Sequence, residues 1–301
     1  MTRNSNQGVF AAAVTPLNSD FTPDIDSLPE FLSFLAQRGC HGALILGTTG
    51  EGPSFSFTER KIIYQAASNV RHIHPSFRLL AGTGSPSLQD TINFTRLAFD
   101  LGMDGVVVLP PYYYKNVTDE GLLSWFSNVI EESVPSDGAL FGYHIPQISN
   151  VPLSIDLLKR LKDKYPDQFA GLKNSSSDPT HALKLSDSFG DELTVFTGND
   201  RLFSLSLDVG ASGCITSLAN VISPDLRVVW DAYQSGETHP ATQEQIDRNR
   251  VIFDRYPPVA PVLKSILSRC HGFPKWTVRQ PLLPLSKDIE EQVIADLGLD
   301  C

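Results

Sequence analysis

Short apolar runs alternate with helical stretches along most of this 301-residue chain, and this alternation limits the possible folds more than any other feature. The runs are only four to seven residues long, as buried strands are, and the segments between them carry apolar residues at helical spacing. The predicted strands are Val9–Thr15, Ala43–Gly47, Leu79–Gly82, Gly105–Leu109, Ala139–His144, Ala170–Lys173, Thr194–Thr197 and Gly213–Thr216. The helices predicted to follow them are Ser27–Arg38, Thr58–Val70, Leu88–Leu101, Asp119–Glu132, Ser154–Tyr165, Pro179–Phe189, Arg201–Val209 and Ser223–Tyr233.

Eight strands that are each followed by a helix predict a parallel sheet, because every helix acts as a crossover between neighbouring strands. Closed on itself, this α/β ladder is a (β/α)8 TIM barrel, which usually needs about 250 residues. We therefore assign residues 1–235 to a barrel that carries the active site and residues 236–301 to a C-terminal helical extension. Helices are expected in the extension at Thr242–Tyr256, Pro261–Cys270 and Asp288–Leu297. The alternative is an open doubly wound sheet, but residues 82–87 lack the third glycine of a dinucleotide-binding fingerprint.

The charge balance excludes several classes of partner. With 34 acidic and 24 basic side chains the net charge is −10, which argues against nucleic-acid binding. No apolar run is long enough to span a membrane. The polar start, Met1–Gln7, is short and poor in arginine for a transit peptide, so we expect a cytoplasmic protein and leave an organellar location open.

Neither the cysteines nor the histidines form a metal-binding pattern. Cys40, Cys214, Cys270 and Cys301 are scattered without a C-x-x-C pair, so we predict neither a disulfide framework nor a zinc site. His72 and His74 fall on a helix-to-strand connection, at the opposite end of a barrel from its active site, and no metal triad is evident.

In barrels of this kind the active site lies at the carboxyl ends of the strands, so reactive side chains at strand ends are the candidates. Lys173 ends an apolar strand. Most such lysines extend along apolar surface to reach solvent, but a desolvated amine can instead form a Schiff base with a carbonyl group. Tyr143 ends the preceding strand and either packs there or relays a proton. His144 points to the opposite face by the two-residue period of a strand, which indicates a structural role.

Several loops at the same end carry polar or aromatic side chains. Thr48 and Thr49 lie between two glycines, where such a turn either binds a carboxylate or satisfies its own hydroxyls. Glu51 is expected to cap or brace that loop, without a catalytic role. Tyr113 belongs to a tyrosine run that faces either a ligand or another subunit. The polar residues predicted to meet substrate hydroxyls, unless they are ordinary loop residues, are Ser149, Asn199, Asp200 and Ser217.

Taken in order, these motifs resemble the dihydrodipicolinate synthase and N-acetylneuraminate lyase family of class I aldolases. The resemblance covers nearly the whole chain, and each motif lies at or near a strand end. The motifs are Val14-Thr15-Pro16, Gly47-Thr48-Thr49-Gly50-Glu51, Ala81-Gly82-Thr83-Gly84, Pro111-Tyr112-Tyr113, Tyr143-His144-Ile145-Pro146, Gly171-Leu172-Lys173 and Gly213-Cys214-Ile215. Ile215, in the last motif, is predicted to line the substrate site.

The resemblance implies a role for each matching residue. Lys173 matches the lysine that forms a Schiff base with pyruvate or a 2-keto acid, and Tyr143 matches the tyrosine that shuttles the proton. Thr48 matches the threonine that links this tyrosine to a second one, supplied here by Tyr113 of a neighbouring subunit, so a homodimer or homotetramer is implied. Thr48 and Thr49 would hold the pyruvate carboxylate. The reaction implied requires no metal and no organic cofactor.

The departures from the family pattern concern the second substrate. Synthases that use aspartate semialdehyde typically carry asparagine directly after the strand-five tyrosine and arginine five positions after it; this chain has His144 and Ile148. Isoleucine cannot replace the two charge-assisted bonds that arginine makes to a carboxylate. We therefore predict a lyase for a 2-keto-3-deoxy sugar acid or 4-hydroxy-2-oxoglutarate. The alternatives are a 4-hydroxy-tetrahydrodipicolinate (dihydrodipicolinate) synthase and a non-catalytic barrel that only binds pyruvate.

Overall fold

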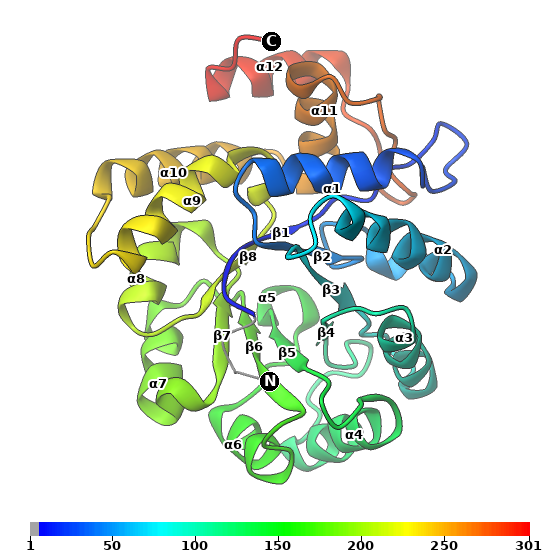
Figure 1. Ribbon diagram of the computed structural model, residues 1–301, viewed down its shortest axis with the longest axis vertical. Coiled ribbons are helices and arrows are strands. Elements are labelled where there is room, and N and C mark those ends of the chain that lie inside the picture. Colours follow the sequence, from blue (N-terminus) through cyan, green and yellow to red (C-terminus); the bar gives the residue numbers. More distant parts are fainter. Residues whose placement is uncertain (1–5) are drawn as a thin grey trace.

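The computed structural model describes residues 6–301, and residues 1–5 of the polar start lie outside the described part. Eight parallel strands close into a barrel in sequence order, with β1 paired to β8 (Figure 1). The strands are β1 Gly8–Ala12, β2 Gly42–Ile45, β3 Arg78–Gly82, β4 Gly105–Val108, β5 Leu140–His144, β6 Phe169–Asn174, β7 Thr194–Thr197 and β8 Gly213–Thr216. All eight predicted strands are confirmed, and the open doubly wound alternative is wrong.

Helices follow the strands and surround the barrel (Figure 1). The barrel helices are α1 Ser27–Gln37, α2 Phe57–Ser68, α3 Leu88–Asp100, α4 Asp119–Ser133, α5 Pro146–Ser149, α6 Ile155–Lys164, α7 Pro179–Phe189, α8 Phe203–Asp208 and α9 Ala219–Gln234. Short 3-10 turns lie at Gly52–Ser54, Asn69–His72, Gly190–Glu192 and Asp200–Leu202. The one-turn helix α5 was not predicted, because four residues are too few to show helical periodicity.

The strands separate two layers of apolar side chains. Inside the barrel, a small cluster that includes Phe10, Phe141, Tyr143 and Phe196 fills the interior. A larger cluster lies between the strands and the surrounding helices. Because successive side chains of a strand point to opposite faces, every strand contributes to both layers, and this alternation decides which polar residues can reach the mouth of the barrel.

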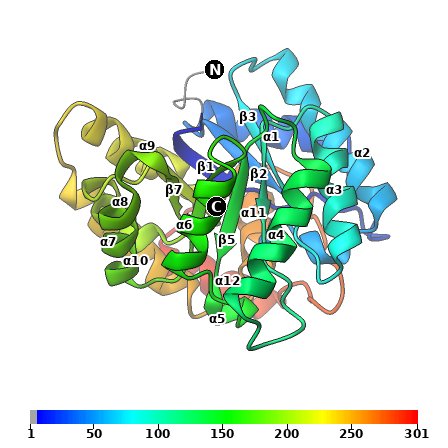
Figure 2. The ribbon, with the colours of Figure 1, turned by 90° about the horizontal axis from the view of Figure 1, so that it is seen from below.

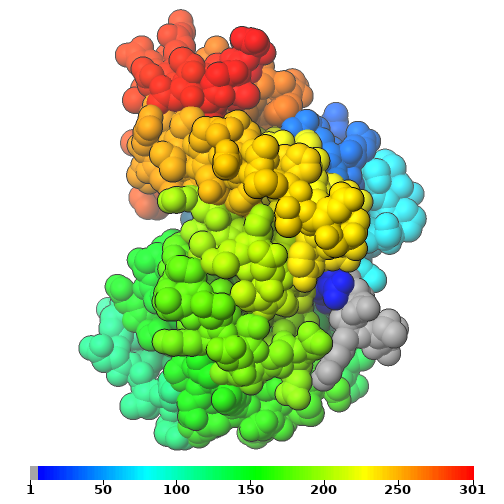
Figure 3. Space-filling model, turned by 90° about the vertical axis from the view of Figure 1, so that its left-hand side faces the viewer, coloured from blue at the N-terminus to red at the C-terminus, as the bar shows by residue number. Residues whose placement is uncertain are grey.

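The C-terminal extension consists of α10 Pro240–Phe253, α11 Val259–His271 and α12 Lys287–Leu297, close to the predicted helices. The predicted boundary at residue 236 falls in the connection between α9 and α10. In a side view of the barrel, the extension lies near the end that carries α5 (Figure 2). The extension forms one end of the molecule (Figure 3). Aromatic rings fix it to α1, since Phe31 lies 5.6 Å from Phe273 and 5.5 Å from Trp276 between ring centroids.

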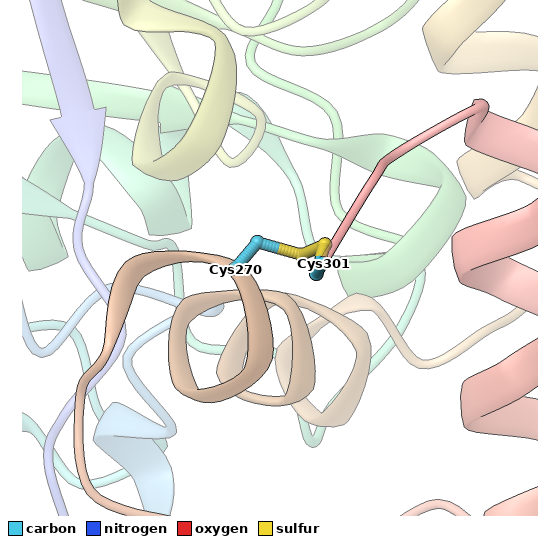
Figure 4. The surroundings of a disulfide bond; sticks show 2 residues. All are labelled: Cys270 and Cys301. Carbon is cyan, nitrogen blue, oxygen red and sulfur yellow. A yellow bond between two sulfur atoms is a disulfide. The ribbon is translucent and has the colours of Figure 1, made fainter.

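A disulfide corrects the prediction made from the cysteine spacing. Cys270, near the end of α11, is bonded to the last residue, Cys301, with 4.8 Å between their Cα atoms (Figure 4). Their separation of 31 residues matches no recurrent motif, so the pair could not be recognised from the sequence. Cys40 and Cys214 are free and buried, and burial raises the pKa of the Cys40 thiol to about 12.

Across residues 6–301 there is no helix with the length and apolar character that crossing a membrane requires.

The disulfide should stabilise the extension without affecting the barrel mouth. Cys301→Ser is expected to lower the free energy of unfolding by about 3 kcal/mol, because the bond no longer restricts the unfolded chain. Chemical denaturation with and without a thiol reductant measures this. The reduced wild-type protein should match the variant, and the variant should not respond to the reductant. Equal stability of the oxidised wild-type protein and the variant would contradict the expectation.

Candidate active site

Lys173 and Tyr143 form the centre of the candidate site. They are register partners on the adjacent strands β5 and β6, near the carboxyl ends of both. Both side chains are buried, with 3% of Lys173 and 6% of Tyr143 exposed, and the Lys173 Nζ lies 4.2 Å from the centroid of the tyrosine ring. The structure therefore places an amine next to a phenol at these strand ends. They belong to the residues predicted to act as the nucleophile, Lys173, and the proton carrier, Tyr143.

Neighbouring side chains lower the pKa of the Tyr143 phenol. Burial by itself would raise the pKa of Tyr143, but the positive charge of Lys173 and hydrogen bonds with Thr48, Lys173 and Ser175 outweigh it, so the pKa is lowered from its usual 10.0. A lowered pKa brings the phenol closer to the range in which it can give and take a proton at neutral pH. This shift supports the proton-carrier role predicted for Tyr143.

Ser175 is a partner of Tyr143 that the sequence analysis did not identify. It follows Lys173 by two residues, so the period of a strand directs both side chains to the same side. Gly198, after β7, makes room for it, because a Cβ at position 198 would lie 1.8 Å from the Ser175 Oγ. The two-residue spacing from Lys173 was the signal in the sequence that could have found it.

The loop after β2 brings Thr48 to Tyr143. Thr48 is exposed at the mouth and Thr49 is buried, with 7% of its surface exposed. Glu51 adopts a left-handed backbone conformation with φ of 58°, and its amide donates to the Thr48 carbonyl at 3.1 Å. As predicted, Glu51 braces the loop: its carboxylate contacts Lys264 of α11 at 2.6 Å.

Positive charge accumulates at the mouth. A cavity there is lined by Thr48, Arg60, Gly84 and Tyr143 among others. The Arg60 guanidinium is buried, donates to backbone carbonyl groups that include Gly82 at 2.9 Å, and lies over an aromatic ring. Within residues 6–301 neither Arg60 nor Lys173 forms a salt bridge with a carboxylate. A site with two buried cations and no paired carboxylate is suited to an anionic ligand.

The other residues predicted to bind substrate have different surroundings. Ile215 belongs to the barrel interior. The Ser149 hydroxyl is fully engaged by the backbone of residues 145 and 151, at 3.1 to 3.2 Å. Asn199 caps the turn at Asp200–Leu202 and donates to a nearby serine hydroxyl at 2.9 Å. The Ser217 hydroxyl accepts from Arg250 of α10 at 3.3 Å.

Tyr113 is exposed to solvent, and His144 is buried on the opposite face of its strand from Tyr143. Tyr113 is 74% exposed, and its ring contacts Tyr114 at 5.2 Å between centroids; in the described part of the chain no hydrogen bond joins it to Thr48. In a single subunit the predicted tyrosine relay therefore lacks the contact between Tyr113 and Thr48.

His144 is buried behind the strand, where it accepts from the Leu153 amide at 3.1 Å and stacks on His181, as the structural interpretation predicted.

Two cations of the extension were also missed. Lys264 pairs with Glu51, and Arg250 bonds the fully buried Asp200 at 2.9 Å through Nε. Both partners lie in loops at the barrel mouth. The signal for Lys264 was a lysine within the apolar pattern of its helix, at a position that periodicity assigns to the core.

In residues 6–301 no group of three or more histidine, cysteine or acidic side chains is arranged to hold a metal ion.

The closed barrel with a buried amine–phenol cluster at its mouth defines an α/β-barrel protein with its site at the strand ends. Comparisons with known proteins specify this class. The profile of the dihydrodipicolinate synthetase family matches residues 5–298. An uncharacterized DapA-like lyase of Chloroflexus aurantiacus is 39% identical over 94% of this chain and 93% of its own length.

Two synthases are also similar. The 4-hydroxy-tetrahydrodipicolinate synthase 2 of Halalkalibacterium halodurans is 26% identical over 92% of each chain. The crystal structure of dihydrodipicolinate synthase from Agrobacterium tumefaciens is 29% identical, with a TM-score of 0.86 over 97% of this chain and 99% of that one. The chain therefore belongs to the dihydrodipicolinate synthetase family, and it is a carbon–carbon lyase of that family.

The charge of Lys173 should be the main reason why the pKa of Tyr143 is lowered. In Lys173→Met the pKa of Tyr143 is expected to rise, because burial still disfavours the phenolate and the neighbouring cation is gone. Ultraviolet titration, with the same titration of a Tyr143→Phe background subtracted, measures this pKa. Lys159→Met, at an exposed lysine of α6, should leave it unchanged. An unaltered pKa in Lys173→Met would refute this account of the site.

Proposed function

We propose that this protein is a class I aldolase that forms or cleaves a 2-keto acid with pyruvate as one partner. The observation that carries the proposal is the buried Lys173 amine, which lies against Tyr143 at the strand ends and has no carboxylate partner within residues 6–301. A buried amine with a proton carrier beside it has the arrangement that Schiff-base chemistry requires. Membership in the dihydrodipicolinate synthetase family supports the same reaction class.

The chemistry follows from these groups. Lys173 adds to the keto carbon of pyruvate, and loss of water leaves a protonated imine at that carbon. Tyr143 moves the proton between the amine nitrogen and the departing oxygen. In the condensation direction the pyruvate imine loses a proton from C3, and the resulting enamine carbon attacks an aldehyde, whose oxygen takes up a proton. In the cleavage direction the imine forms instead on the keto carbon of a 4-hydroxy-2-keto acid. Its 4-hydroxyl loses a proton, the C3–C4 bond breaks to release an aldehyde, and the bond electrons pass to the imine nitrogen, which leaves the enamine of pyruvate. Protonation of that enamine at C3 restores the imine. Water then releases pyruvate and restores the lysine.

Thr48 and Thr49 are proposed to hold the carboxylate of the keto acid. The exposed Tyr113 is proposed to complete the site of a second copy of this chain, so that the enzyme would work as a homodimer or homotetramer. A cytoplasmic location stays a prediction. The Cys270–Cys301 disulfide weighs against it, because such bonds are typical of oxidising compartments.

Borohydride trapping tests the mechanism. Incubation with pyruvate and borohydride should add to Lys173 the mass of pyruvic acid less one oxygen atom, located by peptide mapping. Lys173→Ala should give no adduct, while Lys159→Ala, at an exposed surface lysine, should give the full amount. An adduct that persists in Lys173→Ala, or a folded wild-type protein that gives none, would overturn the proposal.

For the 2-keto acid that is cleaved to pyruvate and an aldehyde, or formed from them, we propose a 2-keto-3-deoxy sugar acid or 4-hydroxy-2-oxoglutarate. Ile148 supports the sugar acid over aspartate semialdehyde, because it is 58% exposed on α5 and offers no charge to a semialdehyde carboxylate. The runner-up is 4-hydroxy-tetrahydrodipicolinate synthase, which the named relatives keep in consideration. In its favour, Lys115 lies near α5 and donates to the Ser149 carbonyl at 2.8 Å, so a second cation is close to this position.

Turnover assays separate the two functions. Pyruvate release from the 2-keto acids should exceed condensation of pyruvate with aspartate semialdehyde. Ile148→Arg should raise the condensation rate by about tenfold through charge-assisted bonds to the carboxylate, whereas Ile148→Met should not. Faster condensation than cleavage by the wild-type enzyme would establish the synthase instead.

A further inference from the structure

A buried ion pair joins the C-terminal extension to the loop that carries Thr48. The side chains of Lys264 and Glu51 are each 1% exposed, and their Nζ and Oε1 atoms are 2.6 Å apart. Lys264 also donates to the Thr277 carbonyl at 2.6 Å. The other Glu51 oxygen accepts from the backbone amide of Arg279 at 2.6 Å. Both oxygens of this carboxylate are thus held by the extension.

The loop itself needs such an anchor. Leu46 and Glu51 have φ of 57° and 58°, in the left-handed region that side chains other than glycine rarely adopt. Such residues stay in place only where their surroundings hold them. The loop folds back closely between them: the Gly52 amide donates to the Gly47 carbonyl at 3.0 Å, and a Cβ at position 52 would lie 1.9 Å from the Leu46 oxygen.

A continuous chain of contacts leads from the ion pair to the phenol. Lys264 holds the Glu51 carboxylate, and the Glu51 amide donates to the Thr48 carbonyl at 3.1 Å. Thr48 lines one cavity together with Tyr143, and its side chain lowers the pKa of that phenol. Leaving a buried carboxylate without its countercharge costs much free energy. Replacement of Lys264 should therefore displace Glu51 and, through it, Thr48.

We propose that Lys264 is a positioning residue for the reaction. Its ion pair with Glu51 fixes the β2–α2 loop so that the Thr48 hydroxyl meets Tyr143, which makes the C-terminal extension part of the machinery for proton transfer. This proposal rests on the proposed function, since it assigns Lys264 a role in the step that Tyr143 carries out. A purely structural role would predict lower stability without a specific dependence on Thr48.

A second set of contacts, which does not involve Lys264, also joins the extension to loops at the barrel mouth. Arg250 of α10 bonds Asp200, after β7, and Ser217, after β8. The loops after three strands are therefore fixed by helices that follow the barrel in sequence. This arrangement favours a role for the extension in shaping the site.

The first test compares Lys264→Met with Lys275→Met. Lys275 is a matched control, because it belongs to the same extension but is 75% exposed and forms only a peripheral pair with Glu290 at 3.7 Å. Lys264→Met should speed hydrogen exchange in the peptide that covers residues 46–52. It should also slow trapping of pyruvate on Lys173, measured by timed borohydride quenching, by about 10- to 100-fold. Lys275→Met should change neither. Unchanged exchange and trapping in Lys264→Met would overturn the proposal.

A double-variant cycle with Thr48→Val separates positioning from general damage. If Lys264 acts through Thr48, Lys264→Met should slow trapping by less than about twofold when Thr48 is already valine, whereas independent effects would multiply. The combined variant Glu51→Gln with Lys264→Met contains no unpaired buried charge, so it serves as the anchor-free form if Lys264→Met does not fold. The slowing of trapping by Thr48→Val can be multiplied by the slowing by Lys264→Met, or by the anchor-free form. If the combined variant is slowed by that full product, Lys264 does not act through Thr48.

The wild-type control keeps the two proposals apart. No adduct in the folded wild-type protein would overturn the proposed function. A normal wild-type adduct, with equal trapping and equal hydrogen exchange in the anchor-free variant, would overturn the positioning role alone.

Discussion

The pairing register between β5 and β6 is the constraint on which the site depends. It sets Tyr143 opposite Lys173, and the pleat of the strands turns both side chains into the barrel. A slip of one residue would exchange Tyr143 for His144 at the mouth. His144 is suited only to the outer side, where burial, helped by the neighbouring His181, lowers its pKa to about 4 and keeps the ring neutral at neutral pH. The same alternation thus produces both a reactive phenol and a structural imidazole.

Much of this arrangement is predictable from the sequence because it is local. Strand and helix periodicity identifies all eight βα units, and the position of a side chain at the end of a strand identifies Lys173, Tyr143 and Thr48 as neighbours in the fold. The inward direction of Tyr143 follows from counting residues along its strand. Even the bracing role of Glu51 follows from its place in a tight loop, although the group that it contacts does not.

The features that escape prediction are contacts between distant segments. Glu51 and Lys264 are 213 residues apart, Asp200 and Arg250 are 50 apart, and the two bonded cysteines are 31 apart. No local period specifies which loop a helix of the extension will meet. A buried lysine in an apolar helix shows that a countercharge must exist, because an unpaired buried charge is costly, but it does not say where the partner lies in the chain. Only the closed barrel, with the extension packed near its mouth, determines that pairing.

The distribution of charge at the mouth bears on the choice of substrate. The cations Lys173 and Arg60 lie on the barrel side, where the carboxylate and keto group of a 2-keto acid would bind. At α5, by contrast, Ile148 presents an exposed apolar side chain, and the Gln147 amide is engaged by the Ser175 carbonyl. Within residues 6–301, Ile148 cannot form paired bonds to a second carboxylate at α5, and the cation near this helix is the Lys115 ammonium, which donates to the Ser149 carbonyl at 2.8 Å. We infer that a keto acid with a neutral, hydroxylated distal end suits this site better than a dicarboxylate does, which favours the 2-keto-3-deoxy sugar acids over 4-hydroxy-2-oxoglutarate.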